Sequence, residues 1–71
     1  MESARMQIVL NGKAREVARG ITIAGLLQNL SLPGTRVAVE RNGEIVRKPV
    51  YDSTGLAEGD RLEIVTLVGG G

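Results

Sequence analysis

The feature that most constrains the fold of this chain is a pair of Asn-Gly dipeptides, each preceded by apolar residues of strand period. Apolar side chains alternate along positions 6–10 before Asn11-Gly12 and along 37–39 before Asn42-Gly43. Asn and Gly readily adopt the positive φ angles that a tight two-residue turn between antiparallel strands requires. The sequence therefore predicts two β-hairpins, whose return strands run through 14–17 and 45–46.

Between the hairpins the apolar period changes to that of a helix. In ITIAGLLQNLSLPG the apolar side chains recur at i, i+3, i+4 and i+7, namely Ile23, Leu26, Leu27 and Leu30. Thr22 is the expected N-cap, because its hydroxyl can accept a hydrogen bond from a first-turn N–H. Pro33-Gly34 ends the segment. Gly25 within it costs about 1 kcal/mol relative to alanine, which a close approach of the helix to the sheet would explain.

The remaining chain holds a turn-rich segment and a final strand. Residues 49–60 are expected to form one short irregular or helical turn, and 61–68 a strand entered through Gly59-Asp60. One short helix can cover one face of a mixed four- to five-stranded sheet. The first and last strands would then be parallel neighbours at its centre. This α+β pattern predicts a ubiquitin-like β-grasp fold with one main helix packed on one face.

The same pattern divides the chain into three parts. Residues 1–5 match neither period and are expected to be a loose leader. Residues 6–67 form the β-grasp domain, and 68–71 form a flexible glycine-rich tail.

Composition excludes several classes of enzyme. The 71-residue chain has neither Cys nor His, so it cannot by itself build a thiolate nucleophile, a Cys/His zinc site or a Ser-His-Asp triad. A net charge of +1 and a single aromatic residue give no footprint for nucleic acid. Its aliphatic runs are far shorter than the roughly 20 residues of a membrane span. We expect a cytoplasmic protein, monomeric alone, that is not an enzyme and binds no metal or cofactor.

Alternation along the last strand assigns its side chains to two faces. Leu62 and Ile64 fall on the core face, whereas Val65 and Leu67 fall on the other. Val65 and Leu67 would then be exposed aliphatic residues beside the tail, as in a partner-binding patch. The alternative is a bulge that buries them. With Val68 they form the predicted partner interface.

The chain ends in three glycines, Gly69, Gly70 and Gly71. Termini are commonly disordered, so a frayed end is one interpretation. The other makes the terminal carboxylate the reactive group. Four residues beyond the strand extend roughly 13–14 Å, and glycine can pass a channel that a side chain would block. A carboxylate must first be activated, typically by ATP as an acyl adenylate in another enzyme, which requires no Cys or His in this chain.

These segments together carry a family resemblance. The sequence resembles the thiamine-biosynthesis sulfur-carrier proteins (ThiS), small β-grasp proteins that end in Gly-Gly. The resemblance covers 6–71 and rests on MQIVLNGK, ITIAGLLQNL, VAVERNGEIVRK, LAEGDRLEIV and the closing VGGG. Each hairpin motif alone is weak, because Asn-Gly turns are common. Their order, the length of the chain and its ending make the resemblance specific.

The resemblance implies a cycle run by other proteins. An adenylyltransferase related to ubiquitin-activating enzymes would use ATP to adenylate the Gly71 carboxylate. Sulfur from a cysteine desulfurase persulfide would replace AMP and give a thiocarboxylate, which thiazole synthase would use to build the thiazole ring. In that family the terminal Gly-Gly pair, here Gly70 and Gly71, enters the partner sites, and Gly69 extends the tail. The chain would thus be a carrier and co-substrate of both enzymes.

Two alternatives remain open at this point. The small subunit of molybdopterin synthase has the same fold and the same Gly-Gly chemistry, but it tends to be longer and to carry aromatic residues in its first strand. The other alternative is a β-grasp binding module whose tail has no function. Such a module should tolerate extra residues after Gly71, and a carrier should not.

Other polar residues are interpreted as structural. Lys13, Arg47 and Lys48 flank turns and are expected to be solvated. Asp60 and Glu63 are expected to be turn and surface residues, and Tyr51 a half-buried cover of the core. Asp52, Ser53 and Thr54 are expected to make local turn hydrogen bonds.

Overall fold

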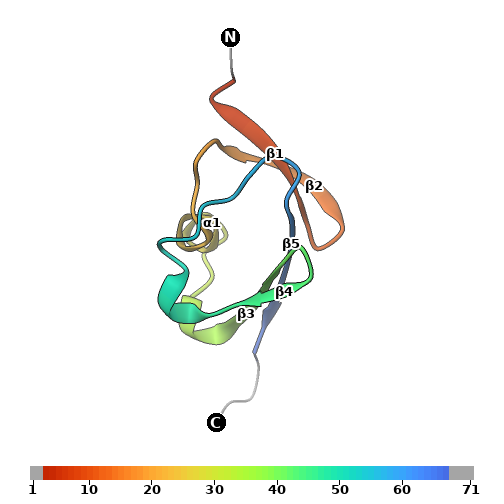
Figure 1. Cartoon of the computed structure of the whole chain (residues 1–71). Helices are drawn as coiled ribbons and strands as arrows, with labels where there is room; N and C mark the ends of the chain where they lie inside the picture. The colour runs from red at the N-terminus through yellow and green to blue at the C-terminus, as the bar shows by residue number, and fades with distance from the viewer. Residues whose placement is uncertain (1–2, 68–71) are drawn as a thin grey trace.

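The computed structural model describes residues 3–67 and has one helix and one sheet in that range (Figure 1). The strands are β1 (Arg5–Leu10), β2 (Lys13–Ala18), β3 (Val37–Arg41), β4 (Glu44–Val46) and β5 (Arg61–Thr66), and the helix is α1 (Ile23–Asn29). Two short 3₁₀ turns, η1 (Gly34–Arg36) and η2 (Lys48–Val50), complete the elements. The expected order of elements is confirmed, and the short turn expected within 49–60 is η2, which begins one residue earlier at Lys48.

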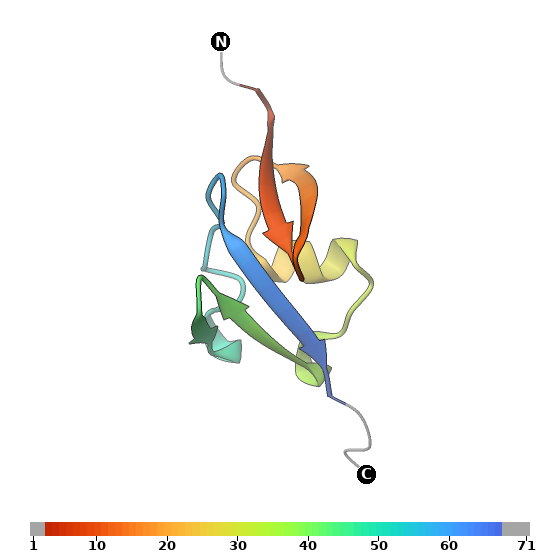
Figure 2. The ribbon, with the colours of Figure 1, turned by 90° about the vertical axis from the view of Figure 1, so that its right-hand side faces the viewer.

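The five strands form a mixed sheet in the order β2-β1-β5-β3-β4. β1 and β5 are parallel, with Val9 opposite Arg61, and every other pair is antiparallel. The last strand therefore lies at the centre, between the two hairpins. Figure 2 shows the sheet in front of α1, so the helix covers one face and leaves the other open. This is the predicted ubiquitin-like β-grasp arrangement.

Both Asn-Gly turns have the predicted backbone geometry. Asn11 and Gly12 have φ angles of 49° and 82°, and Asn42 and Gly43 have 52° and 87°. Two successive residues with positive φ match the right-handed twist of the paired strands. Both predicted hairpins, β1–β2 and β3–β4, are therefore confirmed.

The helix begins at the expected cap. The Thr22 hydroxyl accepts a hydrogen bond from the Gly25 N–H at 3.0 Å, and Ile23, Leu26 and Leu27 of α1 are buried. The expected reason for Gly25 is wrong. A Cβ there would lie 3.0 Å from Cγ1 of Ile21 and 3.4 Å from the Thr22 hydroxyl, not against the sheet. The tight contact is with the chain that enters the helix.

The core lies between α1 and the covered face of the sheet. Its largest fully buried side chains are Ile8, Ile23, Leu26, Val37, Val39 and Leu62. Tyr51 belongs to this core, since it is 7% exposed rather than half-buried as expected. Burial raises the pKa of the Tyr51 hydroxyl, because the charged form loses hydration. Aliphatic packing with one aromatic residue thus supplies the hydrophobic stabilisation of a small domain.

The leader was expected to span residues 1–5, and the assignment of its last residue is wrong. β1 begins at Arg5, within the segment expected to be loose. Arg19 holds this segment, because its N–H donates to the Ala4 carbonyl at 2.9 Å and its Nε donates to the Ser3 carbonyl at 2.8 Å. Residues 1–2 and the predicted tail at 68–71 lie outside the described residues.

Candidate functional site

The two faces of β5 have opposite exposure. Leu62 and Ile64 are buried against the helix side, whereas Val65 is 58% exposed and Leu67 is 47% exposed. The chain remains regular here, because the Leu67 N–H donates to the Arg36 carbonyl at 2.8 Å beyond the end of the strand. The predicted face assignment is confirmed and the bulge alternative is wrong. The role of these residues in partner binding stays a prediction.

The exposed residues of β5 have apolar neighbours on the open face. Ala38 of β3 lies opposite Val65. Ile45 of β4 is 76% exposed. It lies opposite Glu40 of β3, which is two residues from Ala38 and so on the same face of the sheet. We call Ala38, Ile45, Val65 and Leu67 the open-face patch. Sequence reasoning missed Ile45, although its alternation with the core-packed Val46 signals an outward side chain.

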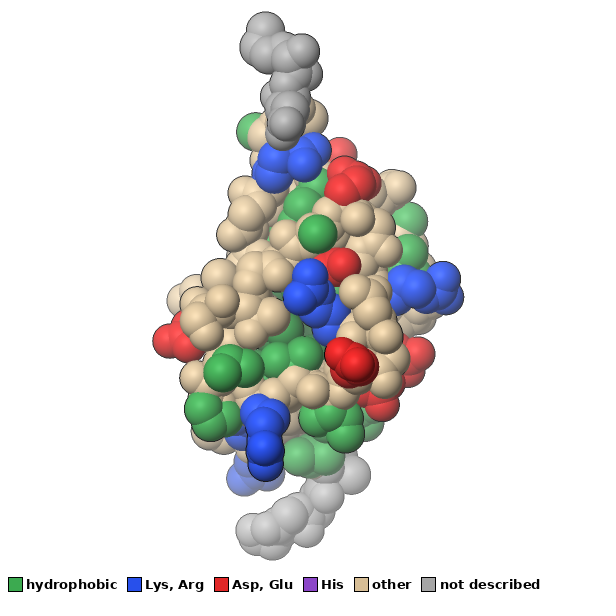
Figure 3. All heavy atoms as spheres, viewed as in Figure 1, with side chains coloured by type: hydrophobic (Ala, Val, Ile, Leu, Met, Phe, Trp, Pro, Cys, Tyr) green, Lys and Arg blue, Asp and Glu red, His purple; other side chains and the backbone are tan. Residues whose placement is uncertain are grey.

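A shallow groove adjoins the patch. Ala38, Ile45 and Leu67 line it together with Arg47 and Lys48. Figure 3 shows hydrophobic side chains gathered in the lower part of the molecule, with Lys or Arg side chains among them. The two basic residues therefore border apolar surface, where sequence reasoning expected only solvated side chains.

Two carboxylates lie beside the open-face patch. Glu63 of β5 is directly opposite Glu40 of β3, two residues along each strand from the Ala38–Val65 pair and therefore on the same face. Among residues 3–67 neither carboxylate makes an ion pair. Like charges directly opposite each other across two strands are destabilising. Glu63 is a surface residue as expected, but its neighbour makes it part of an acidic pair.

The side chain of Asn11 also forms hydrogen bonds to the central strand. Its side-chain oxygen accepts from the Ile64 N–H at 2.9 Å, and its side-chain nitrogen donates to the Ile64 carbonyl at 3.2 Å. The carboxamide thus pairs with β5 as one further residue of β1 would. Sequence reasoning missed this contact. The available signal was the choice of Asn, which carries both a donor and an acceptor, at a position where Gly would also satisfy the turn.

Asn42 holds the start of β5 in a similar way. Its N–H donates to the Arg61 carbonyl at 2.7 Å, and its side-chain oxygen accepts from the Arg61 N–H at 2.9 Å. Its side-chain nitrogen donates to Asp60 at 3.1 Å. Both Asn-Gly turns therefore hold the central strand, from opposite sides.

Asp60 is buried, and its expected place on the surface is wrong. Its carboxylate accepts hydrogen bonds from Arg41 Nε at 2.8 Å, from the Ala57 N–H at 2.8 Å and from Asn42. Burial alone raises the pKa of Asp60, but these hydrogen bonds and the Arg41 charge outweigh it and lower the pKa below its ordinary value. A carboxylate held charged by three donors stabilises the loop before β5 rather than acting as an acid or base.

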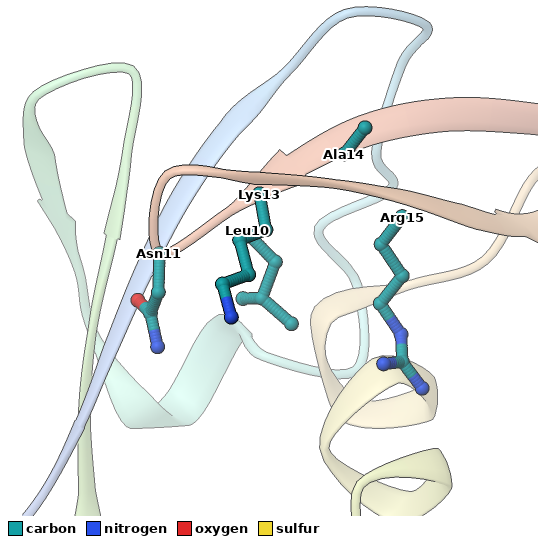
Figure 4. Close-up of a pocket in the computed structure, with 5 residues that line it drawn as sticks. All are labelled: Leu10, Asn11, Lys13, Ala14 and Arg15. Carbon is teal, nitrogen blue, oxygen red and sulfur yellow. The ribbon is translucent and has the colours of Figure 1, made fainter.

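The other polar residues singled out in the sequence make no catalytic cluster in the described part of the chain. Lys13 lies beside Arg15 and Leu10 at a surface hollow, and these three side chains extend to the helix side while Ala14 points away (Figure 4). The hydroxyls of Ser53 and Thr54 donate to the Val50 carbonyl, which confirms their role in the turn.

Two further observations concern metals and membranes. Within residues 3–67, no three His, Cys, Asp or Glu residues lie close enough together to hold a metal ion. In the same range the helix is too short to cross a membrane.

The predicted reactive end lies outside the described residues. Val68, Gly69, Gly70 and Gly71 follow Leu67 directly, so β5 sets the place from which they start. β5 runs along the centre of the sheet and ends at the edge of the molecule (Figure 2). Val65 near its end and Leu67 just beyond it belong to the open-face patch. Any group carried by the terminal residues therefore starts beside exposed apolar surface.

The fold and this strand define a ubiquitin-like β-grasp protein whose chain leaves the central strand beside an exposed patch. The model of the ThiS family matches residues 8–71. The chain belongs to the ThiS family. The sulfur carrier protein ThiS of Bacillus subtilis (strain 168) is 43% identical over 63 residues, which cover 87% of this chain and 96% of that protein.

A solved structure and longer proteins are similar as well. The crystal structure of the thiamine biosynthesis protein ThiS from Geobacter metallireducens superposes with a TM-score of 0.80 at 33% identity, covering 93% of this chain and 100% of that one. A thiazole synthase of Paramagnetospirillum magneticum (strain ATCC 700264 / AMB-1) is 44% identical over 66 residues, or 93% of this chain. The matched segment makes up only 20% of the length of that relative.

Proposed function

We propose that this chain is a sulfur carrier for thiamine thiazole biosynthesis and acts in the cytoplasm without being an enzyme. The observation that carries the proposal is the match to the ThiS family, which extends through Gly71. The chain contains no Cys or His to form a nucleophile of its own. Its reactive group is then the Gly71 carboxylate, and its partners supply the catalysis.

The first step belongs to an adenylyltransferase that uses ATP. A carboxylate oxygen of Gly71 attacks the α-phosphorus, pyrophosphate leaves, and an acyl adenylate forms. A persulfide sulfur, supplied by a donor such as a cysteine desulfurase, then attacks the acyl carbon and displaces AMP. A thiol cleaves the resulting S–S bond and leaves a thiocarboxylate on Gly71. No cofactor needs to be bound by the carrier itself.

The acceptor of the sulfur is thiazole synthase. The support for this partner is that a segment similar to 93% of this chain forms part of proteins named thiazole synthase. Two activities that share one chain in some organisms commonly cooperate when they are separate. In this proposal the open-face patch contacts the partner, while Gly69 and Gly70 pass into its site because they lack side chains.

An intact-mass measurement tests the proposal. The chain is incubated with the adenylyltransferase of the same organism, ATP and a sulfur donor. We expect the mass increment for one oxygen replaced by sulfur, localised to Gly71 by fragmentation. The control variant lacks Gly70 and Gly71, and a second variant carries one alanine after Gly71. Both should remain unmodified at the native terminus.

The outcomes separate the alternatives. A binding module with an inert tail predicts no adduct on any variant, and the same adduct on the truncated variant would also contradict the carrier. A molybdopterin-synthase carrier would give the same thiocarboxylate, so sulfur delivery must be tested separately. We expect thiazole formation when thiazole synthase and its other substrates are added.

A further inference from the structure

The central strand is paired on both sides over only part of its length. On the β3 side the register continues through Ala38–Val65 and Val37–Thr66. On the other side β1 ends at Leu10, which lies opposite Leu62. Figure 2 shows the β1–β2 hairpin ending beside the middle of β5, whose last part has a neighbour on one side only.

Alternation along β5 shows which backbone groups this leaves open. Arg61 and Leu67 bond to the β3 side, through the Asn42 N–H and the Arg36 carbonyl. Leu62 accepts from the Asn11 N–H on the β1 side, and Ile64 bonds to the Asn11 side chain there. The N–H and C=O of Thr66 must therefore point to the β1 side. No strand of the described residues lies there, so Thr66 presents an open edge.

A hollow adjoins this edge. It is lined by Asn11, Gly12, Glu63, Ile64, Val65 and Thr66. An added strand would occupy the position that β1 would have if it were longer. Exposed edges of this kind bind extended segments of other chains by backbone hydrogen bonds.

The charge beside the edge indicates what such a segment carries. Glu63 and Glu40 oppose each other on the open face without an ion pair among residues 3–67. In a strand added at this edge, the residue beside Val65 lies on the open face, and a long side chain there can reach diagonally to Glu63. A Lys or Arg there would neutralise a pair that is unfavourable in the free protein.

We propose that an extended segment of thiazole synthase pairs with β5 at Thr66 and places a basic side chain against Glu63. This inference rests on the proposed function, because that function names the partner. The Asn11 carboxamide occupies the backbone groups of Ile64 and so sets where the added strand must stop. Docking by backbone pairing aligns the partner with the tail that follows Leu67.

Hydrogen exchange of the Thr66 amide tests the pairing directly. In the free chain this N–H has no partner among the described residues, so it should exchange faster than the N–H of Ile64 or Leu67. Saturating thiazole synthase of the same organism should slow its exchange at least about tenfold. Binding of the wild-type chain without slower exchange at Thr66 overturns the proposal.

Substitution at the same residue supplies a second test. Thr66→Pro removes the N–H that faces the open edge and leaves the β3 pairing, since proline is tolerated where the N–H points to solvent. We expect about tenfold weaker binding to thiazole synthase. The matched control Thr66→Val keeps the N–H and should bind within about twofold of wild type. Exchange at Leu67 and thermal unfolding report whether each variant is folded.

The contact between Glu63 and a basic side chain is tested with Glu63→Gln. The control is Glu44→Gln, next to the second hairpin turn. Glu63→Gln should weaken binding several-fold at low salt, and the difference should shrink as salt increases. Equal binding by Glu63→Gln and Glu44→Gln overturns the basic contact. If the wild-type chain does not bind thiazole synthase, the partner and this inference fail together. Absence of thiocarboxylate in the mass measurement contradicts the carrier function separately.

Discussion

Single polar residues do more in this molecule than their local patterns indicate. Asn11 and Asn42 each satisfy a turn with positive φ and also bond to the backbone of β5. Asp60 accepts three hydrogen bonds at 7% exposure. These side chains form hydrogen bonds to groups far away in the sequence, which their local patterns do not indicate.

Asp60 should make the protein sensitive to acid. Its pKa is lowered in the folded state, so its contribution to stability is fully present above the ordinary value of 3.8 and is lost as pH falls through the folded value. Asp60→Asn should lower the free energy of unfolding by about 1.5–3 kcal/mol at pH 7. The difference from wild type should shrink as pH falls from the ordinary value of 3.8 through the lower pKa of folded Asp60, because the wild-type carboxylate then becomes protonated.

Urea denaturation across this pH range measures both effects. Asp52→Asn, at an exposed turn residue, is the matched control and should follow the wild-type curve. A constant difference between wild type and Asp60→Asn at every pH would show that the charge of Asp60 is not the stabilising feature.

At the scale of elements, β5 contributes both to the core and to the candidate site. One face of it contributes Leu62 and Ile64 to the core, and the other presents Val65 and Leu67. Its start is held by Asn42 and its middle by Asn11. The strand is thus fixed up to Ile64 on both sides, and its last residues are paired with β3 alone.

Asn11→Gly should loosen β5 without breaking the first turn. Glycine adopts the positive φ of this position, but it cannot make the two hydrogen bonds to Ile64. We expect a loss of about 1–2 kcal/mol in the free energy of unfolding. Exchange of the Ile64 amide should become faster, whereas that of Leu67, bonded to Arg36, should change less. Unchanged exchange at Ile64 would contradict the role of the carboxamide.

At the scale of the whole molecule, the single helix divides the sheet into a covered and an open face. The covered face buries the core, and the open face carries the open-face patch and the acidic pair. The tail begins where the patch ends. Docking and stability therefore depend on opposite faces of one sheet, and substitutions should separate them.

Val65→Asp and Leu67→Asp should weaken binding to the adenylyltransferase or to thiazole synthase while the fold stays intact. Their side chains are 58% and 47% exposed, so a carboxylate there keeps its hydration in the free protein. The contrasting variant Leu62→Ala should cost about 2–5 kcal/mol of stability. Thermal unfolding and a binding titration measure the two properties. Unfolding of Val65→Asp or Leu67→Asp would show that these residues stabilise the core.

Much of the fold could be predicted from local pattern. The Asn-Gly turns, the stripe of α1 with its Thr22 cap, and the faces of β5 depend on residues within a few positions of each other. The predictions for the leader and for Tyr51 failed on distant contacts, because Arg19 holds the start of β1 and packing buries Tyr51. The reason expected for Gly25 failed on a local contact that periodicity does not show, because the Ile21 side chain crowds it. The predicted roles of Val68 and the three glycines remain predictions, because these residues lie outside 3–67.

The sequence by itself determined the hairpins, the helix, the outward direction of Val65 and Leu67 and, through its match to the ThiS family, the chemistry expected at Gly71. Only the tertiary structure decided that Asn11 bonds to Ile64, that Asp60 is buried and charged, and that Glu40 opposes Glu63. The physical reason is distance along the chain. Periodicity and turn preference act over a few residues, whereas Asn11 and Ile64 are 53 residues apart and meet only once β5 lies beside β1.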